Sequence, residues 1–217
     1  MRSMKTLFVA MSICSALIAK PANATLVSVT GPNSSRGVAA AIIAAPADVH
    51  DGAASNKAQQ GFDEVQDFIL LTALAVDGGS IAAGTSVSSH MIFLNNSVAD
   101  GTTLNEHFNV QWTFNGNILG VMSDYTGTEE IGSSNFLGAP GTSYPTVSFN
   151  ARGMEVDDSY SFVGNVLTVN MRIRQPGDWI RVITAGKCDY SVPEPASVML
   201  LGAGLFGGLV RRTRKSS

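Results

Sequence analysis

Apolar and polar side chains alternate along much of the middle of the chain. Residues 108–114 alternate Phe, Val, Trp and Phe with Asn, Gln and Thr, and residues 167–174 alternate Leu, Val, Met and Ile with polar or basic side chains. A period of two is typical of strands with one buried face. Shorter apolar runs predict further strands at 26–30, 38–44, 66–76, 85–94, 118–122, 146–151 and 179–185. The spacing within 62–76 also permits a helical turn before its strand.

Turn signals separate these segments. Asn115-Gly116 lies between two apolar runs and predicts a hairpin with a type I′ turn, in which both residues have positive φ. Gly164-Asn165 predicts a second hairpin, and residues 175–178 (Gln-Pro-Gly-Asp) predict another turn. Many short strands between frequent turns indicate an all-β domain, an antiparallel β-sandwich of jelly-roll or immunoglobulin-like type.

The N-terminal residues have the pattern of a secretory signal peptide. Arg2 and Lys5 precede an apolar stretch at 7–19, which is followed by the small residues Ala22 and Ala24 around Asn23. The apolar stretch is shorter than the roughly 20 residues needed to span a bilayer. We expect export machinery to translocate the chain and signal peptidase to cut after Ala24. The alternative is a buried N-terminal helix.

The C-terminal residues suggest a short membrane anchor. Pro193-Glu194-Pro195 is a rigid, extended break, and residues 196–210 are uncharged and mostly apolar. As a helix this run would span about 22 Å, less than the roughly 30 Å of a hydrocarbon core. A basic cluster follows and would stay cytoplasmic; it contains Arg211, Arg212 and Arg214. Such an anchor suits a temporary tether at the inner membrane, and an ordinary permanent anchor is the alternative.

This C-terminal region resembles the PEP-CTERM sorting signal of Gram-negative bacteria. The resemblance rests on Pro193-Glu194-Pro195, the glycine-interrupted apolar run and the terminal arginines, and it covers about residues 191–215. It implies recognition by an exosortase, a membrane-embedded cysteine protease, and cleavage near the Pro-Glu-Pro. It also implies delivery to the cell surface or to extracellular polysaccharide, often in biofilm-forming species. We therefore divide the chain into a signal peptide at 1–24, a β-sandwich domain at 25–190 and a sorting signal at 191–217, with a hydrophobic helix at each end.

The exported part is acidic and poor in cysteine. Residues 25–192 carry 7 basic and 16 acidic side chains, a net charge of −9, which argues against nucleic acid as a partner. Cys14 and Cys188 are the two cysteines of the chain. Cys188 either pairs between molecules or receives a modification, or it is an ordinary buried residue. The sequence contains no phosphate-binding glycine loop.

Carboxylates in three glycine-flanked loops are weak candidates for a calcium site. They are Asp48 and Asp51 in one loop and Glu155, Asp157 and Asp158 in another, with a further group at 63–67. Calcium takes several oxygen ligands from loops, but the spacing of a calcium-binding EF-hand loop does not occur. The alternatives are a solvated acidic surface and a pair of carboxylates for glycoside hydrolysis.

The histidines and aromatic residues give no catalytic pattern. His50, His90 and His107 lack the spacing of a zinc site, and His90 is expected to be a hydrogen-bonded strand residue rather than part of a catalytic triad. Trp112 is expected in the core. Four other aromatic residues lie near predicted turns, where they could contact sugar rings; they are Tyr125, Tyr144, Tyr160 and Trp179. We expect no catalytic residue and no bound cofactor.

The sequence thus predicts an exported, non-enzymatic protein with a structural or adhesive role outside the cell. A carbohydrate-binding module acting on extracellular polysaccharide is the first alternative, and it predicts a row of three exposed aromatic side chains on one face. A secreted hydrolase is the second alternative, and it predicts a concave pocket with convergent catalytic groups.

Overall fold

The computed structural model describes residues 24–53, 55–96 and 99–186, and this part of the chain is mainly β. One helix, α1 (Thr128–Leu137), interrupts the strands. The strands are β1 (Leu26–Thr30), β2 (Ala41–Ile42), β3 (Gln60–Asp63), β4 (Phe68–Ile69), β5 (Leu74–Val76), β6 (Gly79–Ile81), β7 (Ser86–Leu94), β8 (Asn105–Phe114), β9 (Ile118–Met122), β10 (Ser159–Val163), β11 (Val166–Ile173) and β12 (Asp178–Ala185).

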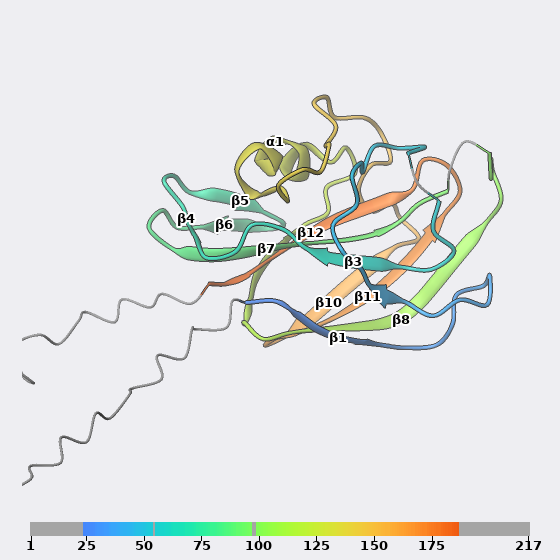
Figure 1. The fold of residues 1–217 in the computed structure, drawn as a ribbon, viewed down its shortest axis with the longest axis horizontal. Coiled ribbons are helices and arrows are strands. Elements are labelled where there is room, and N and C mark those ends of the chain that lie inside the picture. The colour runs from blue at the N-terminus through green and yellow to red at the C-terminus, as the bar shows by residue number, and fades with distance from the viewer. Residues whose placement is uncertain (1–23, 54, 97–98, 187–217) are drawn as a thin grey trace, which may run out of the picture.

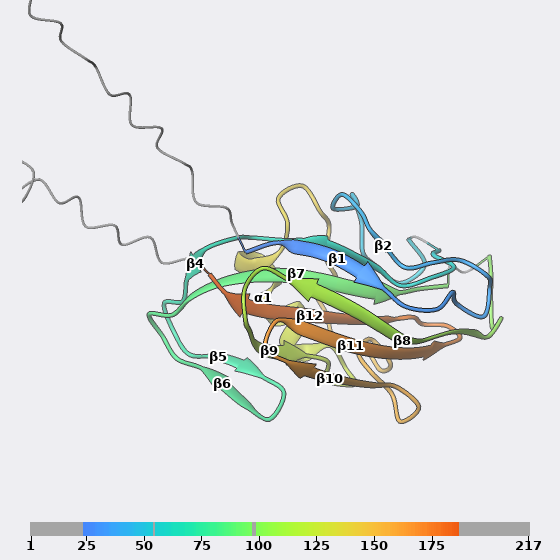
Figure 2. The ribbon, with the colours of Figure 1, turned by 90° about the horizontal axis from the view of Figure 1, so that it is seen from below.

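Two larger sheets and one small hairpin contain these strands (Figure 1 and Figure 2). The first sheet has the order β1-β8-β11-β10 and is antiparallel throughout. The second sheet has the order β2-β3-β7-β12-β9, with β4 also pairing with β7. Its β2–β3 pair is parallel and its other pairs are antiparallel. The β5–β6 hairpin forms a separate two-stranded sheet.

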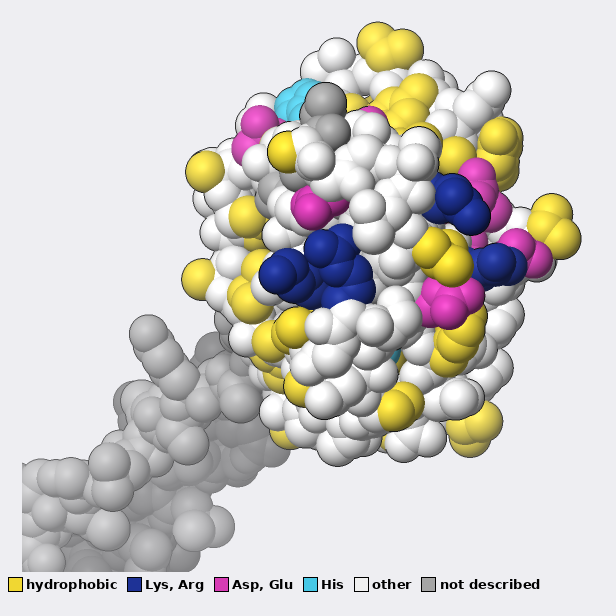
Figure 3. Space-filling view, turned by 90° about the vertical axis from the view of Figure 1, so that its right-hand side faces the viewer, with side chains coloured by type: hydrophobic (Ala, Val, Ile, Leu, Met, Phe, Trp, Pro, Cys, Tyr) yellow, Lys and Arg dark blue, Asp and Glu magenta, His cyan; other side chains and the backbone are white. Residues whose placement is uncertain are grey.

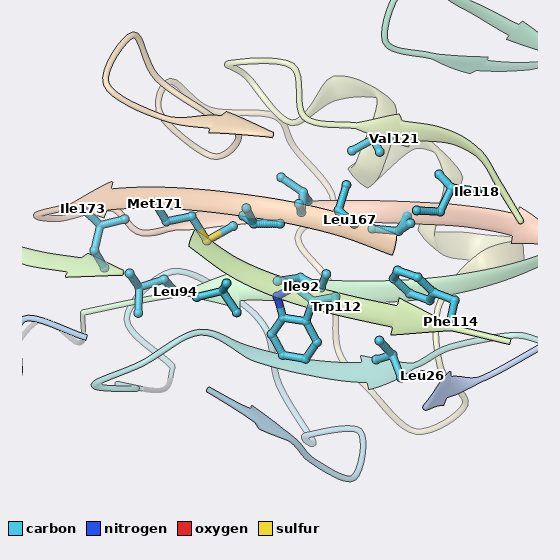
Figure 4. Packing of buried hydrophobic residues seen from close by; sticks show 14 residues of the cluster. Leu26, Ile92, Leu94, Trp112, Phe114, Ile118, Val121, Leu167, Met171 and Ile173 are labelled. Carbon is cyan, nitrogen blue, oxygen red and sulfur yellow. The ribbon is translucent and has the colours of Figure 1, made fainter. Parts of the chain in front are cut away.

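The two larger sheets share one apolar core, which we call the inner layer (Figure 4). It contains apolar side chains from β1, β8 and β11 of the first sheet and from β7, β9 and β12 of the second. Trp112 is fully buried there, as the sequence predicts, and its indole N–H donates to Gln59 Oε1 over 3.0 Å. The prediction of a mainly β domain is confirmed. The predicted flanking helices lie outside the described residues.

Helix α1 and the long loops cover the outer face of the second sheet and form what we call the outer layer (Figure 1). Strands β7 and β12 are therefore buried on both faces. The Asp124 carboxylate stabilises the N-terminus of α1, because it accepts hydrogen bonds from the backbone N–H groups of Thr128 and Glu129 over 2.8 and 3.0 Å. No helix among the described residues is long and apolar enough to cross a membrane.

The prediction of a hairpin at Asn115-Gly116 is wrong. Strand β8 belongs to the first sheet and β9 to the second, so this segment carries the chain from one sheet to the other. Neither residue has a positive φ. The second predicted hairpin is confirmed, because β10 pairs with β11 across Gly164, which has a φ of 61°.

Other differences follow from local structure. The predicted strand at 146–151 is loop and turn, and the one at 66–76 is split into β4 and β5. Phe108 is exposed although it continues the alternation of β8. A bulge at Asn109, with a φ of 58°, shifts the register against β11 and turns Phe108 away from the inner layer.

Candidate functional site

Asp48 and Asp51 lie in the loop between β2 and β3 and have different surroundings. Asp48 is exposed, and the pKa of its carboxyl is lowered because Oδ1 accepts hydrogen bonds from the His50 backbone and lies 2.6 Å from His50 Nδ1. Burial raises the pKa of Asp51, although the backbone of Gly177 and the charge of Arg152 oppose this effect. Its Oδ1 atom is buried and has no hydrogen-bond partner.

Glu155, Asp157 and Asp158 lie together in the loop before β10. Asp158 accepts hydrogen bonds from the backbone N–H groups of Arg172 and Glu155, each over 2.7 Å. The side chain of Arg172 pairs with Asp157 over 2.9 Å. The carboxylates of Asp157 and Asp158 are therefore held by hydrogen bonds within the protein, and Glu155 and Asp157 line part of a hollow of about 270 Å³.

Asp178, which the sequence analysis did not single out, joins this second group of carboxylates. It begins β12, is 2% exposed, and its Oδ2 atom has no hydrogen-bond partner. Burial raises the pKa of Asp178 well above its usual value, and the negative charges of Asp158 and Glu155 raise it further. Within the described residues, no group of three or more histidine, cysteine or acidic side chains is arranged to hold a metal ion. Calcium binding therefore stays a prediction.

His90 is buried in the middle of β7 and connects three strands. Its Nδ1 atom lies 2.7 Å from Asp63 Oδ1 on β3, and its Nε2 atom lies 3.0 Å from Thr184 Oγ1 on β12. The order hydroxyl, imidazole, carboxylate is that of a catalytic triad. However, His90 and Thr184 are both fully buried, and the Phe114 ring packs 4.8 Å from the imidazole. The arrangement joins strands and gives a substrate no access to the hydroxyl.

His107 connects a loop to the inner layer. Its Nδ1 atom accepts a hydrogen bond from the Gln59 backbone, and Nε2 lies 2.9 Å from the Pro32 carbonyl oxygen. Burial lowers the pKa of His107, while the hydrogen bond to Pro32 opposes this shift. The neutral imidazole is thus the form that fits this position.

The outer layer contains a buried network of charges that the sequence analysis missed. Arg181 on β12 donates two hydrogen bonds to the carboxylate of Glu64, over 2.7 and 2.8 Å. It also donates to the carbonyl oxygen of Glu130 and to the hydroxyl of Ser133, both on α1. Burial alone would lower the pKa of Arg181, but Glu64 and Glu130 hold it above its usual value. A charged residue between the apolar residues of β12 was the available sequence signal.

Arg152 extends this network and explains where Trp179 lies. Its Nε atom lies 3.1 Å from Glu130 Oε2, and its guanidinium stacks 3.9 Å above the Trp179 ring. Trp179 follows the turn at 174–177 but is buried, so it is not available to contact sugar rings. Tyr144 is half-buried and donates its hydroxyl to Glu64 Oε1 over 2.7 Å. The network joins α1, β3, β12 and the loop that contains Arg152.

The described chain begins and ends at one place in the fold. Gly116 lies against residues at both ends of the described chain. A Cβ atom added at Gly116 would lie 2.6 Å from the Ala185 carbonyl oxygen and 3.2 Å from Ala24 Cβ. Thr25 is held by Asn115, whose Oδ1 accepts the Thr25 backbone N–H over 2.6 Å. We call this end of the domain the exit end (Figure 1). Ala22, Pro193, Glu194, Pro195, Cys188 and the terminal arginines lie outside the described residues.

Comparison with protein families matches residues 191–215 to the PEP-CTERM protein-sorting motif. The chain carries a PEP-CTERM sorting signal. Its presence implies processing by an exosortase and an exported, cell-surface protein. No curated protein and no solved structure matches the chain.

Proposed function

We propose that this protein has a structural or adhesive role outside the cell, in contact with extracellular polysaccharide. Its domain is interpreted as a β-sandwich, which the core shared by the two larger sheets supports. After removal of the signal peptide and the PEP-CTERM tail, this domain would be the mature, functional protein. Three kinds of observation support the role: the outer face of the first sheet, the positions of the aromatic residues, and the use of the polar interior.

A row of uncharged polar side chains crosses the outer face of the first sheet. In register across its four strands lie Thr30, Gln111, Thr168 and Ser161. The neighbouring positions along the strands point into the inner layer, so these four side chains point outward. Hydroxyl and amide groups can both donate and accept hydrogen bonds, which suits the hydroxyl groups of a neutral polysaccharide. This row is the observation that carries the proposal.

The positions of the aromatic residues do not favour a carbohydrate-binding module that stacks sugars on a row of aromatic side chains. Among the described residues, the exposed aromatic side chains are Phe108, Tyr125 and Phe162. Phe162 is in register with the buried Leu167 and so points toward the core side of the sheet, whereas Phe108 points outward. Tyr125 lies in a loop beyond β9. The predicted row of three aromatic side chains on one face is not formed, and the polar row is the surface that we propose for contact with sugars.

The polar interior supports a structural role over the hydrolase. His90, Arg152 and Arg181 each connect separate segments of the fold, and all three are fully buried. Groups of this kind hold a domain together when every charge has a partner. An open hollow of about 690 Å³ does exist beside Tyr125, Glu155 and Asp157, but Asp157 there is paired with Arg172.

Sorting and adhesion are tested by separate experiments. The chain is expressed in its source cells with an epitope in the loop at 154–158, and Pro193, Glu194 and Pro195 are replaced together by alanine. We expect the variant to stay in the membrane fraction while the wild type reaches the cell surface, and equal release of both would contradict the sorting step.

For adhesion, the released protein is co-sedimented with purified matrix polysaccharide. Q111K/T168K is expected to bind several-fold more weakly than V156K, a control on an exposed loop; equal binding would remove the adhesive face.

A further inference from the structure

Four loops meet at the exit end, around the two termini of the described chain. They are β4–β5 (70–73), β6–β7 (82–85), β8–β9 (115–117) and β10–β11 (164–165). Backbone hydrogen bonds join them: Leu70 N–H to Thr85, Ile118 N–H to the Gly164 carbonyl, and Gly186 N–H to Ser86. The loops therefore form one continuous surface from which the chain leaves the domain.

This surface has no charge and presents aliphatic side chains. None of the four loops contains a charged residue, although the exported part of the chain has a net charge of −9. Leu71 in the β4–β5 loop and Val163 at the end of β10 are 84% and 85% exposed. An apolar hollow of about 320 Å³ lies beside Leu71 and is lined also by Phe68 and Phe136. Exposed apolar side chains beside an apolar hollow are typical of an interaction site.

The opposite end of the domain is different. Figure 3 shows that basic and acidic side chains gather there. They include the pairs Arg36–Asp100 and Arg172–Asp157. A surface with paired charges favours water, so the domain has one end suited to solvent and one end suited to an apolar neighbour.

The length of the tail sets which neighbour the exit end meets. Nine residues separate Gly186 from the apolar run that begins at Ala196. Fully extended, they span at most about 30 Å. While the tail is attached, the exit end thus stays within about 30 Å of the membrane surface and is the part of the domain nearest to the anchor. A lipid surface is also chemically suitable, because aliphatic side chains require no directional partner and the charged end of the domain is kept away from anionic headgroups.

We propose that the exit end docks on the lipid surface while the PEP-CTERM tail is attached, with Leu71 and Val163 reaching the boundary between headgroups and acyl chains. The inference rests on the proposed membrane tether. Docking would hold the segment around Pro193-Glu194-Pro195 near the membrane, where a membrane-embedded exosortase acts. Burial of one leucine changes the ratio of docked to undocked domain by about tenfold or more.

The test uses the full chain in vesicles of phosphatidylethanolamine and phosphatidylglycerol. In a C14S/C188S background, single cysteines at Leu71, Val163 and the control position Val156, which is 100% exposed at the opposite end, carry an environment-sensitive fluorophore. We expect a shift to shorter wavelength and quenching by acyl-brominated lipid at positions 71 and 163, and neither at 156. We also expect L71D to remove most of the quenching at position 163.

Different outcomes separate the tether from the docking. Flotation of the protein with the vesicles reports the tether, and a protein that does not float overturns both proposals. A protein that floats but shows no quenching at positions 71 and 163 overturns docking alone. In cells, a photo-crosslinker at position 71 that gives a protein adduct, without lipid quenching in vesicles, would show that a protein partner covers this end instead.

Discussion

The two buried layers of this domain are stabilised in different ways. The inner layer is formed by aliphatic and aromatic side chains from both larger sheets. The outer layer is formed around two arginines and two glutamates that are almost completely buried, with smaller apolar clusters on either side. Apolar packing tolerates changes of shape if the volume is kept, whereas a buried charge requires its partner. The second sheet separates the layers, so each can be tested without touching the other.

The largest effect is expected from breaking the outer layer at Arg181. R181M removes the two hydrogen bonds and the positive charge that Arg181 gives to the buried Glu64 carboxylate, and we expect a loss of about 3–5 kcal/mol in the free energy of unfolding. Urea denaturation measures this loss. R174M removes an exposed arginine from the neighbouring turn and serves as the control, with a change within about 0.5 kcal/mol. E64L/R181M is expected to recover much of the loss, and a double variant as unstable as the sum of its parts would contradict the network.

The inner layer is expected to tolerate a conservative change and to lose stability from a cavity. Leu167 is fully buried between the sheets, so L167A should cost about 3 kcal/mol. L167M, which keeps the volume, should cost less than about 1.5 kcal/mol. In the outer layer, by contrast, R181K should cost more than L167M, because lysine cannot make the two parallel hydrogen bonds to Glu64. Equal costs for the two conservative changes would remove the distinction between the layers.

Asp178 is a buried carboxyl group whose ionised form is disfavoured, and its replacement by a neutral amide should stabilise the domain. The folded pKa of Asp178 is raised, so folding disfavours its ionised form at neutral pH. The contribution of Asp178 to the free energy of unfolding is greatest below the pKa that this residue has in the unfolded chain. It is lost as the pH rises through the pKa of Asp178 in the folded protein. D178N should therefore raise the free energy of unfolding at pH 7 by about 1 kcal/mol. At pH 3 the gain should disappear; a gain of the same size at both pH values would place its cause elsewhere.

The smallest effect is expected from the protonation of His107, whose imidazole connects a loop to the inner layer. The folded pKa of His107 is lowered below 6.5, so the unfolded chain binds the proton more readily. The stability that neutral His107 provides is thus present above pH 6.5 and is lost as the pH falls toward the folded pKa, with a slope of at most about 1.4 kcal/mol per pH unit. Denaturation of wild type and H107Q between pH 7.5 and 5 measures this, and the variant should have the flatter profile.

The alternation of apolar and polar residues predicted the strands that have one buried face. Local sequence signals did not predict helix α1 or the path of the chain at Asn115-Gly116, where contacts between distant residues determine the structure. Strands β8 and β11 follow the pattern because their other face is exposed. Helix α1 gave no apolar stripe, since its buried residues include Glu130 and Ser133, which contact arginines from distant parts of the chain. Asn115-Gly116 has the composition of a hairpin, but each flanking strand packs in a different sheet.

The candidate surfaces could be predicted from the sequence only in part. The sorting signal is contiguous, and its spacing identifies it without a fold. The polar row on the first sheet requires the register of four strands, and the network at Arg181 requires Glu64, which is 117 positions away in the sequence. The meeting of Ala24, Gly116 and Ala185 likewise depends on the topology of both sheets.

The position of β12 determines how the domain bears force. The C-terminal tail continues from this strand, which pairs with β7 over its whole length on one side and with β9 over residues 181–184 on the other. A pull on the tail along the strand loads both rows of hydrogen bonds together, in shear, instead of opening them one at a time as at the edge of a sheet. If the tail tethers the protein as proposed, the domain should therefore resist unfolding by a force on the tail, because both rows of hydrogen bonds must break together.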